Sequence, residues 1–350
     1  MKVFSFFTEP ASYTLDLVDN VYDTMSIDYC FLNSISKAKT KSKVRKNIFM
    51  DKLSFVDRIR YLIHVRRSYD IIIFNSYNTL SFLFIFLINV FTIKKRYIAI
   101  ESDTQLLIPK NHLKRFLKYF YLSLVFQNKQ VFGLAGGNYS HKDLFRYYGM
   151  KEGSIFLMPM MVDNSKFYVE KKKFPKSFTF LFVGRILDTK NVDKLCQQFI
   201  SHFSNKKAKI IIVGDGEKLE NYKKIYSKKN IIFKGSIFNE ELIDIYNNAT
   251  VFTFPSSLDA WGLVVNEALS AGLPVIARKE VGACFDLISG KQTGFIAEDM
   301  NDFGKMMLTL FNDSELLKNY SKNARDLMKN TWNYKLYEQC MMKFIDKLSK

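Results

Sequence analysis

The chain has 350 residues, of which 48% are hydrophobic and 25% are charged. This length and composition allow two domains with packed cores and exclude a wholly disordered chain. The formal net charge is +18, and residues 1–173 hold 27 Lys and Arg against 14 Asp and Glu. The four cysteines form no CxxC pair, so neither a zinc site nor a redox motif is expected.

The start of the chain does not have the pattern of a secretory signal. Acidic residues at Glu9, Asp16 and Asp19 follow a short apolar opening. The longest apolar run, 80–93, is shorter than the ~20 residues that cross a bilayer. We therefore expect a cytoplasmic protein, and contact with the inner face of the cytoplasmic membrane remains open.

Short apolar runs alternate with helical stretches along the whole chain. Strands are expected at 3–7, 71–75, 97–100, 131–134 and 155–158, and then at 178–183, 210–213, 231–233, 251–254, 274–277 and 294–296. Unbroken apolar strands between helices indicate buried parallel sheets, and hence an α/β protein.

The charged segment 168–177 separates the two series and predicts a linker. We expect domains at 1–170 and 175–334, with a final helix at about 335–350 that packs back on the first domain.

The stretch FVGRILDTK, residues 182–190, places Gly184 and Arg185 at the end of an expected strand. Open α/β sheets bind ligands at this edge. Lys190 follows where the next helix is expected to begin. A guanidinium fork and an ammonium group together suit two phosphates. The alternative is that both side chains only face water.

The stretch PSSLDAWGLVVNEALSAGLPVIA, residues 255–277, reads as a loop, a helix that begins near Gly262, and a strand. A helix N-terminus has unpaired N–H groups that attract an anion. Glu267 lies in the second turn, where a carboxylate accepts hydrogen bonds from ribose hydroxyls, and Asp259 precedes it by eight residues and can reach the transferred sugar. The alternative is a capped helix with two surface acids.

Other strand ends carry weaker signals. Gly214 and Gly216 form a glycine turn in VGDGE without the full GxGxxG spacing, and Gly235 ends a further strand whose backbone is expected near a base. Glu101 and Asp103 follow the strand at 97–100 and are candidates for the acceptor side, with an ordinary polar loop as the alternative. The four histidines show no metal spacing.

As a set, these stretches resemble the retaining GT-B glycosyltransferases of family 4, the glycosyl transferases group 1, in their bacterial polysaccharide-biosynthesis form. In that family a strand-end GR and a following lysine bind the donor diphosphate, which implies this role for Arg185 and Lys190. The family's two glutamates, which have seven residues between them, correspond to Asp259 and Glu267, so the first is aspartate here. The implied catalytic residues are these four.

The same resemblance supplies the donor-binding set. VGDGE is similar to the family's VGxG turn, and WGLVVNEA is close to a bacterial version of its helix-start motif. The implied donor-binding residues are Gly184, Gly214, Gly216, Gly235, Trp261, Gly262, Leu263 and Val264.

The resemblance implies two Rossmann-like domains with parallel sheets that face each other across a cleft. A nucleotide-sugar, with UDP-sugar the first choice, would bind the C-terminal domain, and a glycan or polyprenyl-pyrophosphate-linked acceptor the N-terminal one. It implies retention at the anomeric carbon without a metal or other cofactor.

Two alternatives for the function stay open. One is a phosphorylase or epimerase on the same fold. The other is a nucleic-acid-binding protein, which would leave the GR…K and D-x7-E spacings unexplained.

Two basic segments indicate a phosphate-rich partner. Residues 37–67 hold 11 basic and 2 acidic residues, and KNHLKRFLKYFYLSLVF, residues 110–126, interleaves lysines with aromatic residues like an interfacial helix. They predict peripheral docking on an anionic inner-membrane surface. The alternative is that the aromatic residues are core and the lysines only solvated.

Overall fold

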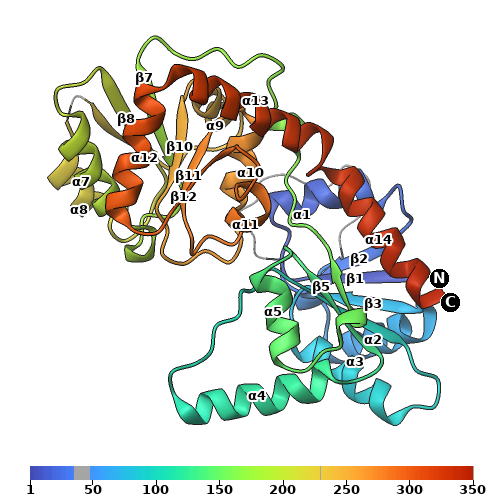
Figure 1. Cartoon of the computed structure of the whole chain (residues 1–350). Coiled ribbons are helices and arrows are strands. Elements are labelled where there is room, and N and C mark those ends of the chain that lie inside the picture. Colours follow the sequence, from blue (N-terminus) through green and yellow to red (C-terminus); the bar gives the residue numbers. More distant parts are fainter. Residues whose placement is uncertain (35–47, 229, 350) are drawn as a thin grey trace. The chain divides into compact units, whose positions relative to one another are not determined.

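The structure is a computed structural model that describes residues 1–34, 48–228 and 230–349. By its contacts the chain divides into two units (Figure 1). Unit 1 comprises residues 1–161 and 334–350, and unit 2 comprises residues 162–333.

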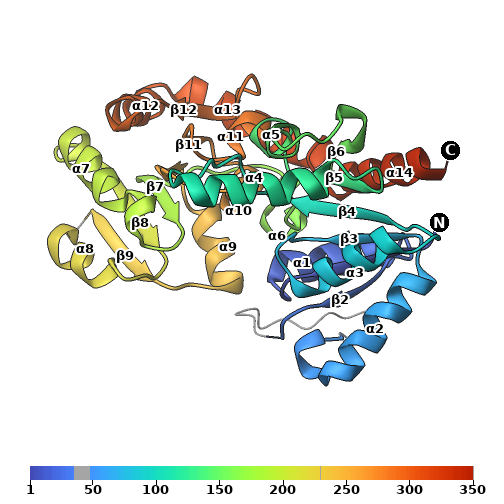
Figure 2. The same ribbon diagram turned by 90° about the horizontal axis from the view of Figure 1, so that it is seen from below.

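Unit 1 is built on a six-stranded sheet in the order β2-β1-β3-β4-β5-β6, and every neighbouring pair is parallel. Helices cover both faces of this sheet (Figure 2). The strands are β1 (Val3–Phe7), β2 (Asp28–Phe31), β3 (Ile71–Phe74), β4 (Tyr97–Ser102), β5 (Val131–Ala135) and β6 (Ile155–Leu157). The helices are α1 (Ser12–Leu17), η1 (Val18–Tyr22), η2 (Met50–Lys52), α2 (Phe55–Ser68), α3 (Leu80–Phe91), α4 (His112–Phe126), α5 (Ser140–Tyr147), η3 (Glu152–Ser154) and α14 (Tyr334–Ser349).

Unit 2 repeats this plan with the order β12-β11-β10-β7-β8-β9, again parallel throughout. The strands are β7 (Phe178–Val183), β8 (Ala208–Val213), β9 (Ile231–Gly235), β10 (Val251–Phe254), β11 (Val275–Arg278) and β12 (Gly294–Ala297). The helices are α6 (Asn164–Phe167), η4 (Asp188–Lys190), α7 (Val192–Phe203), α8 (Leu219–Tyr226), α9 (Asn239–Asn247), α10 (Leu263–Ser270), α11 (Cys284–Leu287), α12 (Met300–Asn312) and α13 (Ser314–Asn330).

The expected strands are all present, because strands buried on both faces are continuous apolar runs. β3 and β10, for example, are buried at every position. β2 is the strand that the sequence did not predict. It is a four-residue edge strand whose first residue, Asp28, is exposed, so it shows no unbroken apolar run.

The boundary between the units differs from the expected linker at 168–177. The amide of Asn164 donates hydrogen bonds to the carbonyls of Met328 (2.9 Å) and Trp332 (2.8 Å), which anchors the chain to unit 2 before that segment begins. Within the segment, Lys172 donates to two carbonyls at the C-terminal end of α9. This lysine therefore caps a helix inside unit 2.

The last helix, α14, packs on unit 1. The Tyr337 hydroxyl donates to Glu101 at 3.2 Å, and the Phe344 ring lies 5.8 Å from Phe132 and 5.2 Å from Phe156 between centroids. Among the helices of the described ranges, none combines the length and the apolar character that a membrane crossing requires.

Candidate functional site

The order of the strands in unit 2 reverses at β7 and β10, which lie side by side. In open α/β sheets a crevice forms at the carboxyl ends of such a pair and receives the ligand. Gly184 and Arg185 follow β7 directly, and the loop from Pro255 to Asp259 follows β10. The two strongest motifs of the sequence therefore lie at one topological switch point.

Lys190 and Asp259 are in direct contact at this point. The Lys190 Nζ atom lies 2.5 Å from Asp259 Oδ2 and 3.3 Å from the Ser256 hydroxyl, and the lysine is only 9% exposed. Asn191, which has a φ of +51°, donates its side-chain amide to the carbonyl of Pro255 and ties the two loops together. Two of the four predicted catalytic residues are thus joined in an ion pair.

Arg185 is placed differently. Its side chain is exposed, and it forms no hydrogen bond or ion pair with any residue that the structure describes. A guanidinium group held at a strand end with its donors unused is suited to a phosphate. The two predicted phosphate-binding cations therefore differ, since Lys190 already has an anionic partner.

The glycines after β7 and β8 let two loops touch. The Gly184 N–H donates to the carbonyl of Val213 at 3.0 Å, and the Ile186 N–H donates to that of Asp215 at 2.8 Å. A Cβ at Gly214, where φ is +138°, would lie 1.8 Å from the Gly184 oxygen. These loops need glycine for their own packing, whatever ligand they hold.

Two other glycines of the predicted set occupy the left-handed region. Gly235 has a φ of +71° and its carbonyl accepts from the Gly214 N–H at 2.8 Å. Gly262 has a φ of +93° and stands at the N-cap of α10. Leu263 and Val264 form the first turn of α10 and are half-buried, so their backbone N–H groups are those available to an anion.

The Trp261 side chain, which belongs to the predicted donor-binding set, is packed inside unit 2. It is 1% exposed, its ring stacks on Trp332 with centroids 5.5 Å apart, and its indole N–H donates to Asn266 at 2.8 Å. Because the indole is enclosed, only the backbone of Trp261 can reach a ligand.

Glu267 is half-buried and accepts a hydrogen bond of 2.7 Å from the hydroxyl of Tyr246. Desolvation raises the pKa of the Glu267 carboxyl to about 7, and the hydrogen bond from Tyr246 acts in the opposite direction. Tyr246 comes from α9, and the sequence analysis did not select it. No local signal marks it, since only the packing of α9 beside α10 brings the two side chains together.

Unit 1 has a cavity of about 300 Å³ at its own switch point, between β1 and β3. Glu101 and Asp103, the two predicted acceptor-side residues, both line it. The other lining residues come from five segments: Phe7, Thr8, Glu9, Tyr13, Thr14, Leu17, Asn75, Ser102, Pro159, Met160, Met161 and Tyr337.

Glu101 is the most enclosed acid of this cavity, at 6% exposure. It accepts hydrogen bonds from Tyr337 (3.2 Å) and Asn75 (3.0 Å). Desolvation raises the pKa of its carboxyl to about 7, although both hydrogen bonds lower it. Tyr337 lies 236 positions away on α14, so no sequence pattern could have linked it to this site. Within the described residues there is no group of three or more His, Cys, Asp or Glu that could hold a metal ion.

Comparison with known proteins identifies the family of unit 2. Residues 164–327 match the family model described as glycosyl transferases group 1. We call this matched segment, which is a little under half of the chain, the group 1 domain. The group 1 domain holds every predicted donor-side residue, and curated relatives that match this chain are named glycosyltransferases.

Two curated relatives show how far the sequence match extends. The chain is 36% identical over 124 residues to the sulfoquinovosyl transferase SQD2 of Arabidopsis thaliana, and the aligned segment covers 34% of this chain and 24% of that protein. It is 29% identical over 182 residues to the capsular polysaccharide biosynthesis glycosyltransferase CapM of Staphylococcus aureus, and that alignment covers 49% of this chain and 47% of CapM. The matches thus span less than half the length of these two relatives.

Solved structures extend the similarity of fold beyond the group 1 domain. The Anabaena protein Alr3699/HepE, crystallised in complex with UDP, superposes with a TM-score of 0.75 at 13% identity, covering 99% of this chain and 100% of that one. The fold is therefore GT-B, with two α/β domains, as the sequence predicted.

Proposed function

We propose that the chain is a retaining glycosyltransferase that moves a sugar from a nucleotide-sugar to a hydroxyl group of a glycan or lipid-linked acceptor. The observation that carries this proposal is the Lys190–Asp259 pair at the switch point of the group 1 domain. The pair places a cation for phosphate and a carboxylate for sugar hydroxyls within one hydrogen-bond length of each other.

On this proposal the donor diphosphate lies against the N-terminus of α10, which Gly262 leaves open to close approach. Arg185 and Lys190 neutralise the charge that develops on the departing nucleoside diphosphate. When Lys190 turns to the phosphate, Asp259 is released to accept hydrogen bonds from the sugar. Glu267 keeps one oxygen on Tyr246 and offers the other to the ribose.

UDP is the nucleotide we propose, since the structurally similar HepE binds UDP. We propose no metal and no other cofactor.

The acceptor would bind in the unit 1 cavity, where the carboxylates of Glu101 and Asp103 and the amide of Asn75 suit a hydroxyl-rich ligand. The volume is at the lower end of the range of small-molecule pockets, about 300–1,000 Å³. CapM is named for capsular polysaccharide biosynthesis, and we propose a related role in bacterial surface polysaccharide, with a glycan or polyprenyl-pyrophosphate-linked acceptor.

The test is a thermal-shift screen of the full chain against UDP, GDP, ADP and their sugars, because a ligand that binds the folded state raises the melting temperature. We expect UDP and one UDP-sugar to give the largest shift, with and without EDTA. Transfer to a sugar acceptor, with the anomeric configuration of the product read by NMR, then tests retention. A melting temperature that none of these nucleotides changes would refute the proposal.

The other candidate functions give different readings in simple assays. A phosphorylase would carry pyridoxal phosphate and absorb in the near ultraviolet. A nucleic-acid-binding protein would retain arbitrary DNA with a steep dependence on salt. The hypothesis of nucleic-acid binding rests on the basic N-terminal half, and the densest part of its basic segment, residues 37–46, lies outside the described residues.

A further inference from the structure

Helices α3 and α4 each expose a continuous apolar stripe. On α3 the exposed residues are Leu80, Leu83, Leu87, Val90 and Phe91, and on α4 they are Leu113, Phe116, Leu117, Phe120 and Leu124. Their spacing of three and four residues puts each set on one side of its helix. The opposite sides are buried in the core of unit 1 through Phe82, Ile85 and Phe86 of α3 and Leu122, Val125 and Phe126 of α4.

The two helices lie on the same face of the sheet. β3, β4 and β5 follow one another in the sheet, and α3 and α4 connect them, so right-handed crossovers place both helices on one side. The loops that follow α3 and precede α4 add exposed apolar residues at Ile93, Leu107 and Ile108. We call this surface, made of the exposed residues of α3, α4 and these loops, the α3–α4 face.

The charges around the α3–α4 face are of one sign. Neither α3 nor α4 contains an aspartate or a glutamate, and the loops at 92–96 and 104–111 contain none either. Exposed cations at Lys94, Lys95, Lys110 and Lys114 border the apolar residues. An apolar surface whose own helices and loops carry cations and no carboxylate is complementary to a membrane with anionic headgroups.

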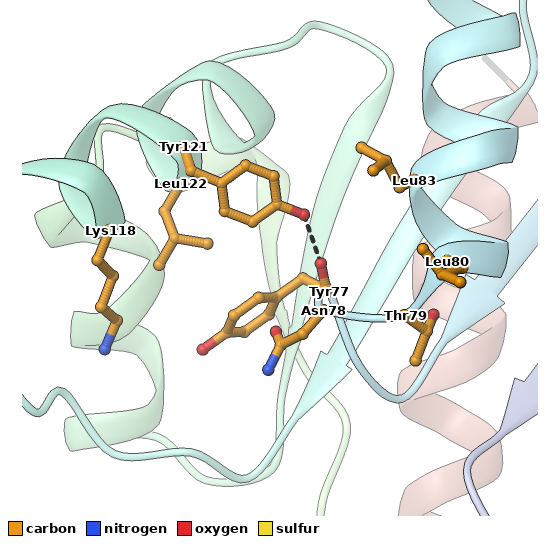
Figure 3. A pocket seen from close by; sticks show the side chains of 8 residues that line it. All are labelled: Tyr77, Asn78, Thr79, Leu80, Leu83, Lys118, Tyr121 and Leu122. Carbon is orange, nitrogen blue, oxygen red and sulfur yellow. Dashed lines mark hydrogen bonds between the residues drawn. The ribbon is translucent and has the colours of Figure 1, made fainter. Parts of the chain in front are cut away.

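A cavity of about 540 Å³ opens in the α3–α4 face. Figure 3 shows it between the start of α3, with Leu80 and Leu83, and the side of α4 that carries Tyr121 and Leu122. The Tyr121 hydroxyl donates to the Tyr77 carbonyl at 2.5 Å between these two walls, and Lys118 lies on the α4 side of the cavity. Its walls are mainly apolar, and its size is that of a small-ligand pocket, about 300–1,000 Å³.

We propose that the α3–α4 face docks on an anionic lipid bilayer, with its apolar residues among the acyl chains near the headgroups, and that the cavity receives one chain of a lipid. α3 has 12 residues and α4 has 15, so each lies along the surface and does not cross it. The docking itself is inferred from the surface alone. Its purpose, to bring the enzyme to a lipid-linked acceptor, rests on the proposed function.

The first experiment is co-sedimentation of the full chain with vesicles of phosphatidylcholine, with and without phosphatidylglycerol. We expect binding that requires the anionic lipid and weakens with salt. Phe116→Ser with Phe120→Ser should weaken it about 100-fold, and Lys114→Gln with Arg115→Gln about 30-fold. The controls in unit 2, Phe238→Ser and Lys223→Gln with Lys224→Gln, change exposed residues of the same kinds and should bind like the unchanged protein.

A second experiment separates insertion from surface attraction. Both native tryptophans, Trp261 and Trp332, are buried in unit 2, so Phe120→Trp introduces a fluorophore that reports on α4. Lipids brominated in the acyl chain should quench it. Leu83→Trp adds apolar area but fills the cavity, so it should lower the affinity for vesicles if a chain enters and raise it if none does.

Three results would overturn the proposal. The first is that every α3–α4 variant still binds vesicles, and the second is that the fluorescence of the Phe120→Trp variant is not quenched on bound vesicles. The third is a dimer in sedimentation velocity that the Phe116 and Phe120 changes dissociate, while no vesicles are bound. Thermal shift with UDP on the same variants keeps the two proposals apart. If the unchanged protein does not bind anionic vesicles but still responds to UDP, only the docking inference is refuted.

Discussion

The ammonium of Lys190 and the carboxylate of Asp259 lie 2.5 Å apart, although 69 positions separate the two residues in the chain. Each belongs to a different strand-end loop, and both are largely buried. Without a ligand, the cation predicted for the donor phosphate is thus neutralised by the carboxylate predicted for the donor sugar. Donor binding must exchange this contact for new ones.

The two predicted phosphate ligands should differ in their effect on stability. Arg185→Ala and Lys190→Ala should each lower kcat/KM about 100-fold or more, since each removes a preorganised charge from the transition state. Lys190→Ala alone should also lower the free energy of unfolding, by about 1–3 kcal/mol, because it removes the cation that pairs with the largely buried Asp259 carboxylate. Steady-state kinetics and calorimetric melting measure both effects.

The control for this pair is the double variant Lys190→Ala with Asp259→Ala. It should recover most of the lost stability, since no charge is left without a partner, and it should remain inactive. Turnover at the level of the unchanged enzyme in either single variant would end the phosphate role.

Glu267 and Asp259 should act on different parts of the donor. Glu267→Gln should weaken binding of the free nucleoside diphosphate about 10- to 100-fold, because it removes a charged acceptor for the ribose hydroxyls. Asp259→Asn should leave that affinity almost unchanged and impair sugar transfer. Isothermal calorimetry on both variants, with Tyr246→Phe as the variant that removes only the partner of Glu267, decides between the assignments. An equal loss of affinity in the two acid variants would show them to be wrong.

The contact between the β7 and β8 loops should be intolerant of a side chain. Gly214→Ala places a Cβ against the Gly184 carbonyl and should lower the melting temperature and abolish the response to nucleotide. Gly235→Ala is the matched control, since it has a positive φ of +71° but no atom within 4 Å of the added carbon. It should lower the free energy of unfolding by only about 1–2 kcal/mol, which is the strain of a non-glycine residue in the left-handed backbone region. Two variants of equal stability would mean that the loops are not in contact.

The buried carboxyl of Glu101 should make the stability of unit 1 depend on pH. Its pKa is raised to about 7 from 4.5, so the folded state holds a proton that the unfolded state loses. The contribution is fully present below about pH 4.5 and is lost as the pH rises through 7. Glu101→Gln should therefore flatten the fall in melting temperature between these values, in differential scanning calorimetry. A pH dependence that is the same in both proteins would contradict the raised pKa.

A change at Trp261 can test whether its side chain stabilises the fold or binds the donor. Trp261→Phe removes the hydrogen bond to Asn266 and part of the stack on Trp332, and it should lower the free energy of unfolding by about 1–3 kcal/mol. The affinity of the folded variant for nucleotide should stay the same, because the indole has almost no exposed surface to lose. A large drop in affinity with unchanged stability would restore the predicted role in donor binding.

Local patterns in the sequence were enough to predict the α/β class and most strands. A strand covered on both faces must be apolar throughout, and this shows in a run such as Ile71–Phe74 without knowledge of its neighbours. Motifs contained in one strand–loop–helix unit were equally visible, and together with the family resemblance they selected Arg185, Lys190, Asp259 and Glu267.

Contacts between distant segments were decided only by the tertiary structure. The partners of the selected acids, Tyr246 for Glu267 and Tyr337 for Glu101, come from other helices and depend on how those helices pack. The same holds for the enclosure of Trp261 and for the apolar stripes of α3 and α4, since an apolar residue reads the same in a sequence whether it faces the core or the solvent.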